Sequence, residues 1–135
     1  MRLSEFLDDD KGDILTCQCG CGYGSRLQHW GTLLVADIHK AGRQALGVPV
    51  YALSGARCPR HNAAVARSER SQHAIAQALD LACPPGIDWD SFCAVYEHAV
   101  SVVTEGQGGF GRYPSQRFVH IDPGLGETPG RRWTE

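Results

Sequence analysis

The chain has 135 residues, of which 42% are hydrophobic and 21% charged, a composition ordinary for a soluble globular protein. This length suffices for one domain with a proper core and is too short for two comfortable ones. The formal net charge of -2 gives no electrostatic reason to expect binding to nucleic acid or to an anionic membrane.

The N-terminal segment is acidic and irregular, and it lacks the uninterrupted apolar stretch of a signal peptide. No run of the sequence approaches transmembrane length. We therefore expect a protein that is made in the cytoplasm. If its substrate lies outside the cytoplasm, another system must deliver the protein. We also expect it to be a monomer. Residues 1–135 are interpreted as a single domain, with an irregular lead-in at 1–14 and a C-terminal tail at 123–135.

Six cysteines are many for this length, though fewer than in a small protein built on disulfides. Cys17, Cys19 and Cys21 alternate with other residues in a glycine-rich stretch, and in an extended chain their side chains would point the same way. A structural zinc site is one interpretation of this spacing. Buried thiols or a disulfide to Cys58 are the other, so the redox state of these cysteines stays open.

The first predicted elements are a helix over residues 25–46 and a short strand over residues 48–53. The helix has a possible capping box, apolar residues at helical spacing, and Gly47 at its end. His29 and His39 on this helix are expected to be surface or packing residues rather than metal ligands. Residues 54–62 should form a loop directly after this strand, which would give the loop a rigid support.

A second strand is predicted over residues 75–82. Its alternation places Ala78, Asp80 and Ala82 on one face and two leucines on the other, and the sequence CPPG at 83–86 ends it. Residues 88–104 predict the second strong helix, with Asp88 as its cap and an apolar stripe along one side.

Residues 109–122 predict a hairpin with a turn near Ser115. The period of two places Phe118, His120 and Asp122 on one face of its second strand. The elements lack a βαβ rhythm, so we predict an α+β fold with helices packed on a mainly antiparallel sheet.

His73, Asp80 and His120 are the candidate metal ligands, because zinc takes nitrogen and carboxylate donors. A histidine followed seven residues later by an aspartate is, however, a weak indication when taken alone. Three segments in order are more specific. They are residues 54–62 (SGARCPRHN), residues 71–81 (SQHAIAQALDL), and the hairpin with GGFGRYP at 108–114 and FVHID at 118–122.

These segments resemble the successive motifs of the zinc D-Ala-D-Ala carboxypeptidase family, over roughly residues 15 to 133. That family includes vancomycin-resistance dipeptidases, phage endolysin peptidases and murein peptidases, and it shares the hedgehog/DD-peptidase fold. The resemblance implies that His73, Asp80 and His120 bind Zn²⁺. It also implies that Arg57 binds the carboxylate of the substrate or polarises its carbonyl, and that Ser71 lines the site.

The chain departs from the family pattern in three places. Several members carry an acid three positions before the last histidine, where this chain has Arg117, and strand alternation turns Arg117 away from His120. Gln77 stands where the family usually has glycine, and Ala56 stands where it usually has tyrosine. Asp122 is therefore our candidate for the general base or for the hydrogen-bond partner of a ligand histidine. A carboxylate that caps the following turn is the alternative.

The resemblance implies a zinc peptidase that cleaves a peptide bond in peptidoglycan stem peptides or crosslinks. The enzyme would reach the cell wall by phage-type release or by another delivery route. Its expected partner is the peptide substrate, and we expect it to bind neither nucleic acid nor a membrane. The alternative is a catalytically inactive, zinc-stabilised binding module of the same fold, as in the hedgehog branch.

Overall fold

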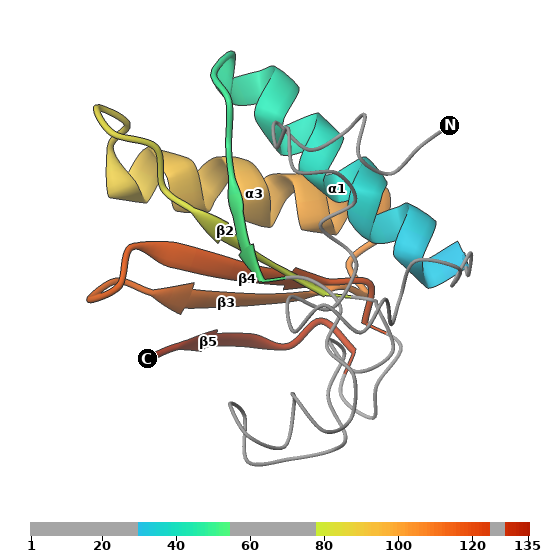
Figure 1. Cartoon of the computed structure of the whole chain (residues 1–135). Coiled ribbons are helices and arrows are strands. Elements are labelled where there is room, and N and C mark those ends of the chain that lie inside the picture. Colours follow the sequence, from blue (N-terminus) through green and yellow to red (C-terminus); the bar gives the residue numbers. More distant parts are fainter. Residues whose placement is uncertain (1–29, 55–77, 125–128) are drawn as a thin grey trace, which may run out of the picture.

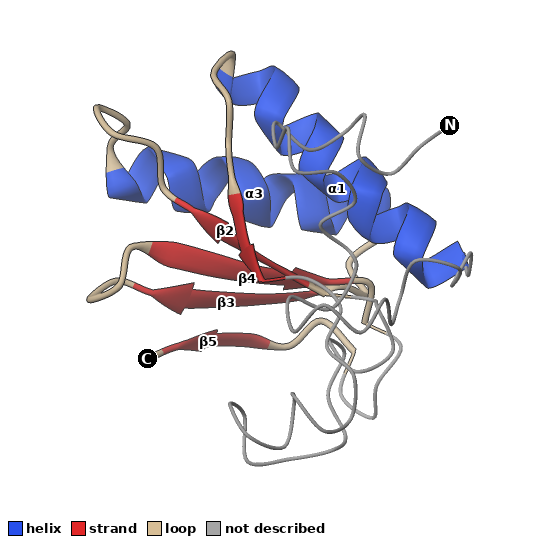
Figure 2. Cartoon of the chain, in the orientation of Figure 1, coloured by secondary structure: helices blue, strands red, loops and turns tan. Residues whose placement is uncertain are grey.

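The computed structural model describes residues 30–54, 78–124 and 129–135, which form two helices and one five-stranded sheet (Figures 1 and 2). The helices are α1 (Trp30–Leu46) and α3 (Trp89–Val103). The strands are β1 (Ala52–Ser54), β2 (Leu79–Ala82), β3 (Gly109–Tyr113), β4 (Phe118–Asp122) and β5 (Arg132–Thr134). Among the described residues, no helix is long and apolar enough to span a membrane.

The strand order in the sheet is β1-β2-β4-β3-β5. Strands β1, β2, β4 and β3 pair antiparallel in that order, and β5 pairs parallel to β3 at the edge. The predicted α+β class with helices on a mainly antiparallel sheet is therefore confirmed. The parallel strand β5 lies in what the sequence predicted only as a tail.

Local sequence signals explain the ends of α3. The Asp88 side chain accepts a hydrogen bond from Ser91 N at 3.0 Å, as predicted for an N-cap, and such a cap typically contributes about 1 kcal/mol. At the other end, the Thr104 hydroxyl donates to Val100 O at 2.6 Å and accepts from Gly108 N at 2.7 Å. These two bonds connect the end of the helix to the chain that enters β3.

The core lies between the helices and one face of the sheet. The side chains that build it are fully or almost fully buried and come from both layers: Val35, Ile38, Leu79, Leu81, Phe92, Tyr96, Val100, Phe110, Val119 and Ile121. Burying each large apolar side chain contributes roughly 1.5–3 kcal/mol. His39 is also buried, and its Nδ1 lies 3.1 Å from the Tyr96 hydroxyl, so it packs between the helices as predicted.

The predicted element boundaries hold best in the C-terminal half. The second helix and the hairpin lie where the sequence placed them. The first strand is shorter than predicted, since it spans Ala52–Ser54 rather than residues 48–53, and its pairing with β2 is irregular there. Residues 25–29 of the predicted first helix and residues 75–77 of the predicted second strand lie outside the described residues.

Candidate active site

Four residues form one row across the sheet, on the face away from the helices. In the strand register, Asp80 of β2 pairs with His120 of β4, His120 pairs with Gly111 of β3, and Gly111 pairs with Trp133 of β5. Directly paired residues of neighbouring strands point to the same face. Their neighbours in sequence, such as Leu79 and Ile121, point into the core.

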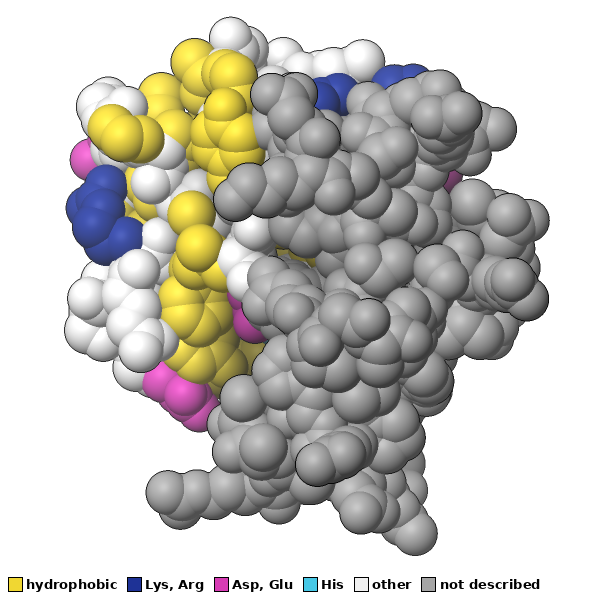
Figure 3. Space-filling view, in the orientation of Figure 1, with side chains coloured by type: hydrophobic (Ala, Val, Ile, Leu, Met, Phe, Trp, Pro, Cys, Tyr) yellow, Lys and Arg dark blue, Asp and Glu magenta, His cyan; other side chains and the backbone are white. Residues whose placement is uncertain are grey.

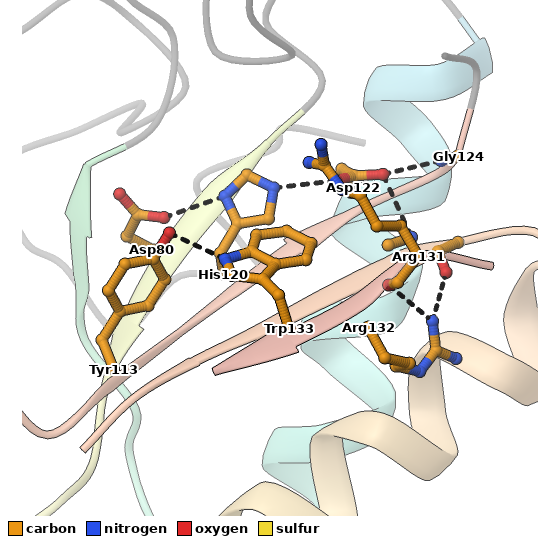
Figure 4. A network of polar contacts seen from close by, with 10 residues as sticks. Asp80, Tyr113, His120, Asp122, Gly124, Arg131, Arg132 and Trp133 are labelled. Carbon is orange, nitrogen blue, oxygen red and sulfur yellow. Dashed lines mark hydrogen bonds and ion pairs between the residues drawn. The ribbon is translucent and has the colours of Figure 1, made fainter. Parts of the chain in front are cut away.

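His120 lies between two carboxylates (Figure 4). Its Nδ1 is 3.1 Å from Asp80 Oδ1, and its Nε2 is 2.8 Å from Asp122 Oδ2. The imidazole ring is therefore held from both sides in one orientation. His120 is only 8% exposed and Asp122 only 3%, so both interactions lie largely out of water.

Asp122 has every carboxylate oxygen engaged by the protein. Its Oδ1 accepts hydrogen bonds from Gly109 N at 3.1 Å and from Gly124 N at 2.9 Å, while its Oδ2 contacts His120. Residue 109 has to be small for this arrangement, because a Cβ there would lie 2.5 Å from Asp122 Oδ2. The glycine thus lets the carboxylate lie directly against β3.

The pKa values of this pair move in opposite directions. Burial lowers the pKa of His120, but the hydrogen bonds and charges of Asp122 and Asp80 outweigh it and raise this pKa to about 9. Burial raises the pKa of Asp122, yet the hydrogen bond and charge of His120 and the two backbone donors hold it below its usual value. Without a metal, His120 is therefore an imidazolium at neutral pH, between two carboxylates.

Trp133 packs against the histidine from β5. Its ring centroid lies 5.2 Å from that of His120, and the indole lies across Gly111, where a Cβ would overlap the ring. The guanidinium of Arg131 lies 4.2 Å from the indole centroid, a distance typical of a cation–π contact. Trp133 is thus held between the sheet and an exposed cation.

Tyr113 completes this cluster at the end of β3. Its hydroxyl accepts a hydrogen bond from Trp133 Nε1 at 3.0 Å, and its ring stacks on Phe118 with centroids 4.4 Å apart and planes 9° apart. Burial is the largest cause that raises the pKa of Tyr113, and the charge of Asp80 raises it further. The hydroxyl therefore keeps its proton at neutral pH.

The structure brings three of the predicted site residues together, namely Asp80, His120 and Asp122. Arg57, Ser71 and His73 lie outside the described residues. Asp80 and His120 supply a carboxylate oxygen and an imidazole nitrogen that face each other, and these donor types fit zinc. Within the described ranges, no group of three or more His, Cys, Asp or Glu residues is arranged to hold a metal ion.

Arg117 points away from the site, as predicted, but it does so from the turn before β4, with a φ of 54°, rather than through strand alternation. Its guanidinium donates to Cys83 Sγ and to Ile87 O, both at 3.3 Å. Glu97, an acidic residue of α3, binds Arg112 at 2.9 Å on the helix-covered side of the sheet. The described residues therefore place no carboxylate other than Asp80 and Asp122 in contact with His120.

Figure 3 is a space-filling view of one face of the molecule. Hydrophobic side chains dominate the described centre of the face seen there, and an acidic side chain appears among them at the border with the residues that are not described. Lysine and arginine side chains lie at the edges of the same face.

Sequence reasoning missed the roles of Tyr113 and Trp133. A signal was present, because Gly109 and Gly111 alternate on the same face of a strand that pairs with the histidine strand. Two glycines at that spacing leave room for large groups to cross the sheet surface. The groups that fill this room are the carboxylate of Asp122 and the indole of Trp133.

Three comparisons with known proteins bear on the family of this chain. The chain is similar to the crystal structure of the Serratia marcescens L-Ala D-Glu endopeptidase ChiX, with 18% sequence identity, a TM-score of 0.45, and coverage of 72% of this chain and 80% of that one. No curated protein sequence matches it. A family profile described as Peptidase M15 matches residues 11–122, which include all three predicted motifs in full. The chain therefore belongs to the peptidase M15 family.

Proposed function

We propose that this peptidase is zinc-dependent and hydrolyses a peptide bond in peptidoglycan stem peptides or crosslinks, as a D-amino-acid carboxypeptidase or an endopeptidase. Membership of the peptidase M15 family supports the reaction class. The observation that carries the proposal is the arrangement of His120, whose two nitrogens face Asp80 and Asp122. Histidines that bind metals commonly use one ring nitrogen for the metal and the other for a carboxylate.

In this proposal, Asp80 and His120 hold the metal together with His73. When bound, zinc lowers the pKa of a water molecule and polarises the carbonyl of the substrate. Asp122 fixes the tautomer of His120, because its carboxylate accepts the Nε2 proton and leaves Nδ1 on the side of Asp80.

Of the three roles predicted for Asp122, the contacts favour the hydrogen-bond partner of His120 and the cap of the following turn, through Gly124 N, over the general base. Both of its oxygens contact donors of the protein and the side chain is almost fully buried, so it is poorly placed to take a proton from a substrate water. The base is then another group or a second water. Arg57 and Ser71 remain our proposed substrate-binding residues, with Arg57 at the carboxylate or carbonyl of the substrate.

The test is the digestion of purified muropeptides by zinc-loaded protein, followed by mass analysis of the products. We expect one bond to be cut, either next to a terminal D-alanine or between L-alanine and D-glutamate, and the product masses identify which. His120→Ala should abolish turnover, whereas His98→Ala is the matched control, since His98 is an exposed histidine on α3. Absence of any cleavage by the parent protein across the tested metals would refute the enzyme proposal.

The second candidate is a zinc-stabilised binding module without turnover. Arg117, in the place of the acid that several family members carry, favours it, because among the described residues no carboxylate then stands ready as a base. This candidate predicts that zinc raises the melting temperature and that muropeptides bind without being cut. In either case, the site of action would be the cell wall, reached by phage-type release or another delivery route.

A further inference from the structure

The hydroxyl of Tyr113 is a hydrogen-bond donor whose proton has no acceptor among the described residues. An indole N–H can only donate, so in the 3.0 Å contact with Trp133 Nε1 the phenol oxygen is the acceptor. The hydroxyl hydrogen must therefore point elsewhere. A phenol that accepts one hydrogen bond also becomes a better donor, because chained hydrogen bonds polarise one another.

This donor is held in place by the packing around it. The ring of Tyr113 stacks on Phe118, and the indole that donates to the hydroxyl is wedged between Gly111 and the guanidinium of Arg131. Few rotamers of Tyr113 satisfy the stack and the hydrogen bond together. A donor that is already oriented costs little reorganisation when negative charge develops beside it.

The same contacts place the hydroxyl beside the candidate metal ligands. Tyr113 lies two positions after Gly111 on β3, so its side chain shares the sheet face of His120. The indole that binds its hydroxyl also contacts the His120 ring, and Figure 4 shows the phenol of Tyr113 on the side of that ring where Asp80 lies. The hydroxyl thus lies on the Nδ1 side of His120, not on the side of Asp122.

We propose that Tyr113 is a catalytic residue of the peptidase, donating a hydrogen bond to the carbonyl oxygen of the scissile bond, and that Trp133 is its positioning residue. The proposal rests on the proposed function. A water oxygen adds to the carbonyl carbon, and the π electron pair moves onto the carbonyl oxygen. When the C–N bond then breaks, the leaving nitrogen takes a proton that came from that water. Tyr113 keeps its own proton throughout and stabilises the negative oxygen.

The first experiment compares Tyr113→Phe with Tyr51→Phe in muropeptide hydrolysis by the zinc-loaded protein. Tyr51 is 55% exposed, so its substitution removes the same hydroxyl outside the cluster. We expect Tyr113→Phe to lower kcat by about 10²-fold with little change in KM, as for the loss of one oxyanion donor, and Tyr51→Phe to change neither. Parent kcat in Tyr113→Phe would overturn the inference while leaving the proposed function intact.

The positioning role of Trp133 has its own signature. Trp133→Phe keeps a ring over Gly111 and removes the indole N–H, so we expect kcat to fall by about 10-fold. Because Trp133 acts through Tyr113, the double variant should be no slower than Tyr113→Phe alone. Multiplied losses in the double variant would contradict this role.

A binding measurement separates failure of the inference from failure of the proposed function. The probes are two phosphinate peptides, in which the tetrahedral phosphorus replaces the D-Ala–D-Ala amide or the L-Ala–D-Glu amide, titrated into zinc-loaded protein by calorimetry. We expect at least one to bind Tyr113→Phe about 10²-fold more weakly than the parent. Tyr113-dependent binding without hydrolysis refutes the proposed function alone. Equal binding to both proteins, including none, overturns the inference.

Discussion

Asp122 and His120 stand two residues apart on β4, and their side chains meet at 2.8 Å. Residues at this spacing in a strand share one face, so the contact is local in sequence. The carboxylate is also buried, and it accepts hydrogen bonds from the backbone of Gly109 on β3 and of Gly124 just after β4. The histidine is therefore oriented by a rigid group.

Asp122→Asn tests this orientation. The amide has nearly the shape of the carboxylate, but it lacks the charge that favours the Nε2–H tautomer of His120. We expect zinc affinity to fall by 10- to 100-fold, as is typical when a partner of a ligand histidine is replaced. Competition with a chromogenic chelator measures this, with Asp90→Asn on the exposed side of α3 as the control. Unchanged affinity would show that Asp122 does not act through the histidine.

Alanine at the two glycines of β3 should give distinguishable defects. Gly109→Ala pushes on the Asp122 carboxylate, so we expect weaker zinc binding together with a loss of about 1–3 kcal/mol in unfolding free energy. Gly111→Ala pushes on the Trp133 indole, so we expect a changed tryptophan emission spectrum and lower kcat with zinc binding closer to the parent. Denaturation, emission spectra and chelator competition together check this contrast, and identical defects in both variants would contradict it.

The metal-free protein should become less stable as the pH rises from 6 to 10. The pKa of His120 is about 9 in the folded protein against an ordinary value of 6.5. Stabilisation from a raised pKa is therefore complete below about 6.5 and disappears as the pH rises through about 9. Urea denaturation in the presence of a chelator measures this slope, and His120→Asn should flatten it. Zinc should reverse the trend over this range, because binding requires the neutral imidazole.

Cys93 should be inert in the folded protein. It is 2% exposed, and burial is the main cause that raises the pKa of its thiol to about 11. Since the thiolate is the reactive form, iodoacetamide at pH 8 should label Cys93 only after unfolding. Peptide mass mapping of native and urea-treated protein checks this, with Cys83, which is partly buried, as the internal comparison. Rapid native labelling of Cys93 would show that α3 opens locally.

Local patterns account for much of the fold. Alternation in β4 places His120 and Asp122 on one face and Val119 and Ile121 in the core, and the cap at Asp88 marks the start of α3. These features depend on residues within a few positions of one another, so a periodicity or a capping rule detects them. The family resemblance rested on short motifs of this kind, and the Peptidase M15 match confirms it.

The sequence by itself determined the two helices, the hairpin and the face on which His120 and Asp122 lie, because helix and strand periods are local properties. Only the tertiary structure decided that Asp80 meets His120 from 40 positions away, and that Trp133 crosses Gly111 to reach both His120 and Tyr113. Those contacts follow from strand register and from the parallel pairing of β5, which depend on how the whole sheet packs. The strand Arg132–Thr134 has only three residues, which is too few for a periodic pattern to predict that it pairs with β3.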